Sequence, residues 1–279
     1  GDAREQEQLA ILALHTLATF DLDHPQILNF MAECAVPYLE NDSAAIRKEA
    51  ALACVHLLQR RGGAGGSGRR MRVGVEEVLD KLLVVAVADP EPEARQVMMR
   101  ALCDARGHCF DSHLAQADSL RALFIGLNDQ VNAVCATTIQ LVGRLSHRNP
   151  AYVLPALRRH LLQLLQELDH SADAQPKEES ARLLGVLIQS CPRLVLPYVS
   201  PILKALVKKL RTHGVAAAPA QPPQSQQQQQ PSSSASMAMV AGAASTGGGA
   251  SGAKAGKMCG RHLQVSVLST IGQLAKVSG

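Results

Sequence analysis

Apolar residues recur along most of the chain at the spacing of one face of an α-helix. The i, i+3, i+4, i+7 pattern is followed within residues 9–20, 27–38, 46–58, 75–86, 97–102, 131–145, 154–168, 181–191, 202–210 and 263–277. No comparable stretch alternates apolar and polar residues as a half-buried strand does. The pattern therefore predicts an all-α protein built from short amphipathic helices.

A longer period overlies the helical one. Asp42, Asp89 and Asp129 each open a turn, and the first apolar residue of a helix follows four or five positions later. These helix starts are Ile46, Ala94 and Val134, and Pro176 stands at the next equivalent position. Two helices per unit at intervals of about 40 to 48 residues are typical of HEAT and armadillo arrays. The predicted fold class is thus a HEAT/armadillo-type helical-repeat solenoid, an α-α superhelix.

This period divides the chain into three parts. Residues 1–212 are predicted to form HEAT repeats: a truncated first repeat with a helix at 5–20, helix pairs at 25–60, 72–106, 113–147 and 150–191, and the first helix of a fifth pair at 193–212. A Gly/Arg-rich loop at 61–72 lengthens the first interval. Residues 213–260 are an insertion, and residues 261–279 form the last HEAT helix.

The insertion 213–260 is rich in Gln, Ser, Gly and Ala, with a glutamine run at 226–230 and a glycine run at 247–249. Such a composition does not bury enough apolar surface to offset the entropy lost on ordering. We therefore expect it to be disordered, as a tolerated insertion between two neighbouring helices and not as a domain boundary.

Composition and charge exclude several classes of protein. With 28 Lys and Arg against 24 Asp and Glu and only 3% aromatic residues, the chain is too weakly basic and too poor in rings for a specific nucleic-acid binder. No run of about 18 uncharged apolar residues predicts a transmembrane helix. The start at Gly1, without Met, suggests a piece of a longer protein.

Seven cysteines are scattered through the apolar stretches, an odd number without the close spacing of a disulfide framework. They are Cys34, Cys54, Cys103, Cys109, Cys135, Cys191 and Cys259. Buried, reduced thiols of this kind are typical of a cytoplasmic protein.

The sequence contains two groups of residues with a partial likeness to a ligand-binding motif. Residues 252–258 come nearest to a phosphate-binding loop, but Ser251 replaces its first glycine and Met258 replaces its magnesium-binding Ser or Thr. The one group with metal-ligand character has looser spacing than a structural zinc site, and we expect a core cysteine beside residues of a turn. Its members are Cys103, His108, Cys109 and His113.

The remaining polar groups are expected to be structural. Three histidines, His15, His56 and His160, have no Cys or Ser at the spacing of a nucleophile. The side chains of the pairs Glu76-Glu77 and Glu178-Glu179 diverge around their helix axes. The string Asn41-Asp42-Ser43 is a glycosylation sequon, which is irrelevant in a reducing compartment. No catalytic, cofactor-binding or metal-binding residue is therefore predicted.

Two basic groups carry alternative interpretations. Arg60, Arg61, Arg69, Arg70 and Arg72 flank glycines and form either a solvated loop or a segment that contacts RNA or anionic lipid. Lys204, Lys208, Lys209 and Arg211 gather near a helix C-terminus, where positive charge complements the helix dipole.

A resemblance to a known family rests on four strings. They are LDKLLVVAVADPEPEARQVMMRAL (79–102), HLAQADSLRALFIGLNDQV (113–131), VGRLSHRNPAYVLPALRRHLLQLLQELDHS (142–171) and KEESARLLGVLIQSCPRLVLPYVSPILKALVKKL (177–210). They resemble the N-terminal HEAT array of target-of-rapamycin (TOR) kinases, which are serine/threonine protein kinases of the phosphatidylinositol-3-kinase-related class. The closing TIGQLAKVSG (270–279) fits the same register. The sequence departs from the family pattern mainly at the insertion and at an enlarged turn, 106–109.

The resemblance implies a non-catalytic scaffold segment for protein–protein interaction and complex assembly in nutrient and growth signalling. Its partners would be TOR-complex subunits such as raptor and a second TOR chain. ATP and magnesium would belong only to a distant kinase domain, and the parent protein would be cytoplasmic, or also at endomembranes or in the nucleus. The alternative is a free-standing HEAT adaptor, such as a transport receptor or a phosphatase scaffold. A third and weaker hypothesis is RNA binding by the Arg-Gly loop.

Overall fold

The computed structural model describes residues 2–20, 26–61, 69–214 and 251–278. Its α-helices are α1 (Asp2–Thr19), α2 (Ile27–Cys34), α3 (Ala44–Arg61), α4 (Arg69–Ala88), α5 (Pro92–Cys103), α6 (Asp111–Leu114), α7 (Ala117–Gly126), α8 (Asn132–Leu145), α9 (Pro150–His170), α10 (Ala174–Ser190), α11 (Pro192–Val195), α12 (Val199–Gly214) and α13 (Ser251–Ser278). Short 3₁₀ helices are η1 (Val36–Glu40), η2 (Arg106–His108) and η3 (Leu196–Tyr198). These described ranges contain no strand, so the all-α prediction is confirmed.

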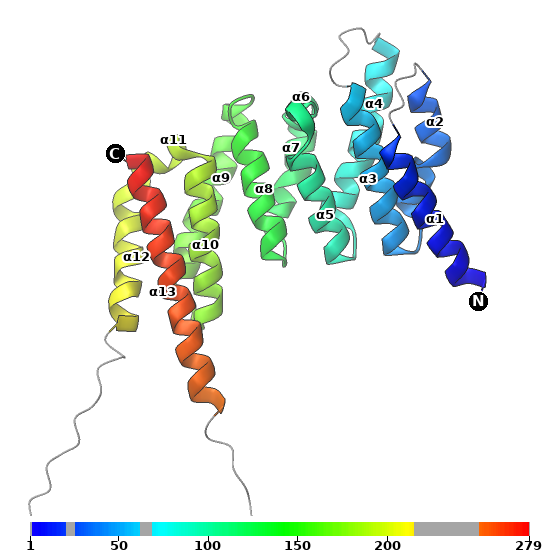
Figure 1. Ribbon diagram of the computed structural model, residues 1–279. Helices are drawn as coiled ribbons and strands as arrows, with labels where there is room; N and C mark the ends of the chain where they lie inside the picture. The colour runs from blue at the N-terminus through cyan, green and yellow to red at the C-terminus, as the bar shows by residue number, and fades with distance from the viewer. Residues whose placement is uncertain (1, 21–25, 62–68, 215–250, 279) are drawn as a thin grey trace, which may run out of the picture.

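The helices form two layers in an extended row, with the chain termini at opposite ends (Figure 1). In one layer α1, α3, α5, α8, α10 and α13 each contact the next. In the other layer α2, α4, α7, α9 and α12 do the same, and each layer also packs against the other. Neighbours in a layer are therefore separated in sequence by one long helix of the opposite layer, with the short α6 or α11 added in some intervals.

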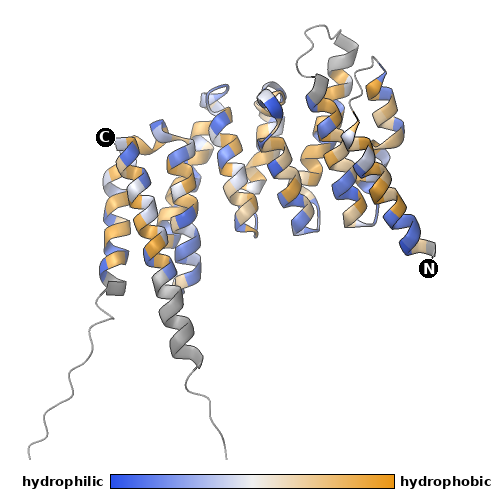
Figure 2. Ribbon diagram, viewed as in Figure 1, coloured by the Kyte–Doolittle hydropathy of each residue, from blue (hydrophilic) through white to orange (hydrophobic). Residues whose placement is uncertain are grey.

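One continuous core lies between the layers. Its largest fully buried side chains are Met31, Leu57, Leu79, Leu82, Met98, Met99, Leu102, Leu114, Leu120, Leu123, Ile139 and Leu141. Figure 2 shows hydrophobic residues along the faces where helices meet and many hydrophilic residues at the turns. Each such aliphatic side chain contributes about 1.5 to 3 kcal/mol on burial, so the core needs few aromatic rings.

Helix boundaries differ from the predicted ones at the glycine-rich loop. Helix α3 continues to Arg61 and α4 begins at Arg69, so part of the predicted 61–72 loop is helical. Arg and Met are good helix formers, and α4 includes them on the C-terminal side of the glycines. Residues 62–68, which hold the glycines, lie outside the described residues.

The larger difference concerns the insertion 213–260. Helix α12 ends at Gly214 and α13 begins at Ser251, so residues 251–260 are helical, in contrast to the predicted disorder. Ala, Lys and Met residues in that stretch favour extension of α13 towards its N-terminus. Residues 215–250 lie outside the described residues, and disorder there stays a prediction.

Helices α10 and α13, far apart in sequence, lie side by side. The Thr270 hydroxyl of α13 is buried and donates to the Ala181 carbonyl of α10 at 2.8 Å. A β-carbon on Gly185 of α10 would meet the side chains of Gln273 and Thr270, so the absence of one permits this close approach. The same α13 also packs on α12.

Among the described residues no single helix is long and apolar enough to cross a membrane. One helix pair in the part of the chain that the structure describes, Ala174–Ser190 and Pro192–Arg211, passes that test when taken together, and it is bent by 114° at its junction.

Candidate functional site

Three turns between the layers share one hydrogen-bonding pattern. The side-chain Oδ1 of Asn41, Asp89 and Asp129 accepts the backbone N–H two residues further on, at 2.9, 2.8 and 2.8 Å. This is an Asx turn, for which either an amide or a carboxylate oxygen suffices. The predicted marker Asp42 is therefore one residue late, because Asn41 occupies the position equivalent to Asp89 and Asp129.

The sixth residue after each Asx position returns to that turn. Arg47 Nη1 and Arg95 Nη1 both donate at 2.8 Å, to the carbonyls of Asn41 and Asp89. Cys135 Sγ donates to the carbonyl of Asp129 at 3.0 Å. The turns at the starts of α3, α5 and α8 are thus built alike.

The two arginines also join each turn to the next. Arg47 pairs with Asp89 through Nε to Oδ2 at 2.7 Å and Nη2 to Oδ1 at 2.8 Å. Arg95 pairs with Asp129 in the same way, at 2.7 and 3.0 Å. Cys135 stands at the equivalent position of the third turn and has no guanidinium, so the series of doubly hydrogen-bonded Arg–Asp pairs ends at Asp129.

Both carboxylates are held in the ionised form. Burial alone would raise the pKa of Asp89, but hydrogen bonds from Arg47 and the Glu91 amide, with the charges of Arg47 and Arg95, lower it overall. The pKa of Asp129 is lowered by Arg95 and the Val131 amide against the same effect of burial. Each carboxylate is therefore stabilised as an anion by the arginine that it pairs with.

A further arginine links a neighbouring turn to α8. Arg144 donates from Nε and Nη2 to Asp111 at 3.0 and 2.8 Å, and from Nη1 to the Cys103 carbonyl at 2.7 Å. It thereby ties the end of α5 and the start of α6 to α8.

The metal-like residues do not converge. Cys103 is buried in the core near Arg144, whereas His113 Nε2 lies 2.9 Å from Asp80 Oδ1 of α4. His108, with a positive φ of 53°, is exposed at the adjoining turn, and Cys109 is half-buried. No group of three or more His, Cys, Asp or Glu among the described residues is arranged to hold a metal ion.

The predicted histidines lie apart. His15 Nδ1 is 3.4 Å from Glu49 Oε2 on the surface, and His56 is exposed on α3. His160 is buried in α9, and burial lowers its pKa, with Glu167 acting in the opposite direction. Neither of its ring nitrogens has a hydrogen-bond partner in the described part of the chain.

The carboxylate pair Glu178-Glu179 and two lysines of the predicted basic cluster of α12 make hydrogen bonds. Glu178 accepts from Arg182 at 2.8 Å, and Glu179 accepts from Gln175 at 3.3 Å. Lys208 Nζ reaches Asp169 Oδ1 at 3.2 Å, and Lys209 Nζ reaches the Asp169 carbonyl at 3.1 Å. Two of the lysines thus join α12 to α9, which the helix-dipole interpretation did not anticipate.

The structure describes the predicted phosphate-binding segment and the predicted Arg-Gly loop to different extents. Residues 252–258 lie within the helical backbone of α13, so they do not form the loop that cradles a phosphate. Arg60, Arg61, Arg69, Arg70 and Arg72 lie at the facing ends of α3 and α4, and their side chains lie outside the described residues. The RNA and lipid hypothesis for that segment stays a prediction.

Most described cysteines are buried thiols. Cys54, Cys103, Cys135 and Cys191 are buried, and none of the described cysteines is in a disulfide. Burial raises the pKa of Cys54 to about 12 and of Cys135 to about 11. Cys34 differs from the prediction because it is exposed. The side chain of Cys259 lies outside the described residues.

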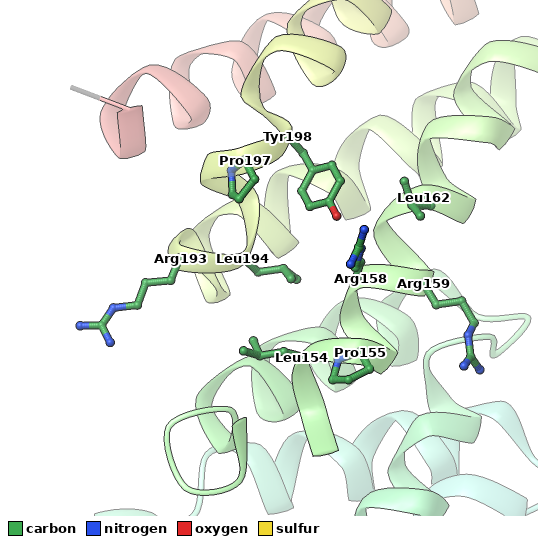
Figure 3. A pocket seen from close by; sticks show the side chains of 9 residues that line it. All are labelled: Leu154, Pro155, Arg158, Arg159, Leu162, Arg193, Leu194, Pro197 and Tyr198. Atoms are coloured by element: carbon green, nitrogen blue, oxygen red, sulfur yellow. The ribbon is translucent and has the colours of Figure 1, made fainter. Parts of the chain in front are cut away.

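An open groove of about 670 Å³ lies between α9 and the segment formed by α11 and η3 (Figure 3). We call it the α9 groove. Its lining residues are Leu154, Pro155, Arg158, Arg159, Leu162, Arg193, Leu194, Pro197 and Tyr198. Pro192 begins α11 and Pro197 lies in η3, so this segment consists of short pieces that leave a face of α9 uncovered. No pattern in the sequence pointed to this groove, because its two walls lie about 40 residues apart, the spacing of one repeat unit.

No family model matches the chain. Over 211 residues it is 49% identical to the serine/threonine-protein kinase TOR of Arabidopsis thaliana, a match that covers 71% of this chain and 8% of that protein. It is 38% identical over 213 residues to the serine/threonine-protein kinase tor1 of Schizosaccharomyces pombe, covering 74% of this chain and 9% of the relative. The serine/threonine-protein kinase mTor of Drosophila melanogaster is 37% identical over 203 residues, which cover 72% of this chain and 8% of the relative.

These matches confirm the resemblance to TOR kinases: the chain contains a segment homologous to them at 37 to 49% identity. It spans only 8 to 9% of the length of these relatives.

Proposed function

We propose that the chain is a non-catalytic segment of a TOR-family serine/threonine protein kinase. In this proposal it forms part of an N-terminal HEAT solenoid and serves as a scaffold that binds other proteins. The observation that carries the proposal is the homology to three kinases, over a segment that folds into two ordered layers of helices.

Support for the HEAT assignment comes from the recurrence of one turn. Asn41, Asp89 and Asp129 occupy equivalent positions, and Arg47 and Arg95 link each turn to the next. Stacked units that contact mainly their neighbours are characteristic of a solenoid, and an extended helical array presents a large surface for partners. The period of about 40 to 48 residues agrees with HEAT and armadillo units.

Support for a structural role comes from the charged groups inside the array. Asp89 and Asp111 are the buried carboxylates of the described residues, and each is paired with an arginine. Phosphoryl transfer by a kinase uses a catalytic Asp and metal-binding Asp and Asn in a phosphate-binding site. In our proposal ATP and magnesium therefore bind to a separate kinase domain of the parent protein.

The proposed partners are proteins of the TOR complex, such as raptor, and a second TOR chain. The proposed setting is cytoplasmic nutrient and growth signalling, in keeping with buried thiols that are typical of a reducing compartment. Homology to kinases favours this assignment over a free-standing HEAT adaptor.

A competition experiment tests the scaffold function. The 279-residue chain is added in excess while the full-length kinase is assembled with its complex subunits. We expect the chain to reduce the raptor retained by the kinase and to leave phosphorylation of a short peptide substrate unchanged. Undiminished raptor retention, or ATP-dependent phosphorylation by the chain alone, would contradict the proposal.

A further inference from the structure

The α9 groove has a mainly apolar lining that also includes three arginines. Leu154, Leu162 and Leu194 line it together with two prolines and Tyr198. Leu162 is 48% exposed although it lies on a helix whose other face is in the core. The groove thus presents apolar surface to solvent in a concave setting, which is typical of binding sites.

Three of the nine lining residues are arginines, and none is acidic. Arg193 and Arg159 lie at opposite ends of the groove, with Arg158 between them (Figure 3). No ion pair of these arginines is found in the part of the chain that the structure describes. This contrasts with Arg47, Arg95 and Arg144, which are all paired with a carboxylate.

Arg158 is held in place by an aromatic ring. Its Cζ lies 5.6 Å from the centre of the Tyr198 ring, on the opposite wall of the groove. A cation–π contact of this kind orients a guanidinium and still leaves its N–H groups available to an acceptor. Less side-chain entropy is then lost when an anionic group binds.

We propose that the α9 groove docks a segment of a partner protein in which apolar side chains are flanked by carboxylates. The apolar side chains would lie on Leu154, Leu162 and Leu194, and the carboxylates would pair with Arg158 and Arg193. Arg and Tyr are enriched among residues that dominate binding energy at protein interfaces. The proposal rests on the scaffold function above and gives it a surface and a partner chemistry.

The three arginines of the groove favour an acidic partner segment over residues 215–250 of the same chain. Residues 215–250 contain no Asp or Glu, so they offer no carboxylate to the three arginines. A groove between α9 and the segment of α11 and η3 also fits projecting side chains better than a flat bilayer surface does.

The test uses a phage-displayed library of random 12-residue peptides, selected on the complete 279-residue chain. Peptides enriched on the chain are synthesised with a fluorescent label, and their affinity is compared for wild type and for the double variant Arg158→Glu, Arg193→Glu. The control variant, Arg4→Glu with Arg100→Glu, makes the same change of charge at exposed positions on α1 and α5. Circular dichroism melting curves verify that both variants keep the wild-type fold.

We expect the enriched peptides to combine Asp or Glu with Leu, Ile or Phe. Their affinity should fall about tenfold or more in the groove variant, because charge-assisted hydrogen bonds are replaced by repulsion, and little in the control. Leu162→Ser should also weaken them by several-fold through loss of apolar contact.

Equal binding of the peptides to wild type and groove variant would overturn the groove proposal, while displacement of raptor by the chain would still support the scaffold function. Selective binding of wild type to phosphatidylserine vesicles, without binding of acidic peptides, would overturn it in favour of a membrane surface. Failure of the chain to compete for raptor would instead overturn the scaffold function itself.

Discussion

Arg47 of α3 and Asp89, in the turn after α4, form two parallel hydrogen bonds of 2.7 and 2.8 Å, with 12% and 2% of their side chains exposed. The same guanidinium donates to the carbonyls of Asn41 and Asp42 at 2.8 and 2.9 Å. One side chain therefore fixes its own turn and the spacing to the next one.

A double-mutant cycle tests the energetic value of this link. Arg47→Met keeps part of the apolar stem, and Asp89→Asn keeps the shape of the carboxylate. Each single change leaves a polar group without its partner in a nearly dry site, so we expect each to cost about 2 to 4 kcal/mol. The coupling energy from urea unfolding at pH 7 should be at least about 1.5 kcal/mol.

The exposed pair Arg121 and Asp118, with 71% and 92% of their side chains exposed, is the matched control. Solvent screens such a pair, and its cycle should show no measurable coupling. If the coupling energy of Arg47 and Asp89 were as small as that of the exposed pair, the buried link would not stabilise the array.

Acid unfolding should depend on the same carboxylates. The pKa of Asp89 is lowered in the folded protein, so its stabilising effect is fully present above the unfolded value of about 3.9. It is lost as the pH falls through the folded value, because only the ionised form accepts from Arg47. Urea midpoints measured from pH 5 to pH 2 should therefore fall less steeply for Asp89→Asn than for wild type. Parallel curves would contradict this assignment.

His160 should make the protein less stable in mild acid. Its pKa is lowered by burial, so the folded state holds the ring neutral, whereas the unfolded state takes up a proton below about pH 6.5. Stability is therefore fully present above that pH and decreases as the pH falls below it.

His160→Leu should remove this decrease and should not destabilise the protein at pH 7.5, because neither ring nitrogen has a partner among the described residues. The difference in thermal midpoint between variant and wild type, followed from pH 7.5 to pH 5, isolates the contribution of His160. A difference that does not change with pH would refute the assignment.

Substitution by alanine should change the stability of the protein in opposite directions at two glycines, Gly143 and Gly272. A β-carbon on Gly143 of α8 would lie 2.7 Å from Ser190 Cβ and 3.0 Å from the Ser190 carbonyl oxygen of α10. The backbone atom cannot rotate away, so overpacking outweighs the better helix propensity of alanine, and Gly143→Ala should cost about 1 to 3 kcal/mol.

Gly272→Ala in α13 is the matched control, because a β-carbon on Gly272 would meet no neighbouring helix within 4 Å among the described residues. It gains helix propensity without a clash and should stabilise by about 0.5 to 1 kcal/mol. Unfolding midpoints of the two variants shifted in the same direction would contradict the close approach of α8 and α10.

The helices could be predicted from the sequence because burial of one face imposes a 3.6-residue period that survives in the apolar positions. The predicted position of the first turn, Asp42, is one residue late because Asn41 forms the same Asx turn with an amide oxygen. The helical backbone of residues 251–260 was missed because their small and polar composition resembles that of the adjoining insertion, whereas a helix can extend beyond its packed part.

The α9 groove could not be predicted in the same way. Arg158 and Tyr198 are far apart in sequence, and their contact depends on how α9 packs against the segment of α11 and η3. Exposed Leu162 also looks like any other apolar residue of the helical pattern. A concave surface between two elements that are distant in sequence is a property of their packing, which no local pattern encodes.

The most direct test of the account is the sequence of the complete transcript from which the chain derives. A TOR-family kinase predicts a downstream catalytic loop with its Asp and Asn, followed by a metal-binding Asp-Phe-Gly string. A reading frame that continues only as helix pairs, or stops shortly after residue 279, would contradict the assignment of this chain to a kinase.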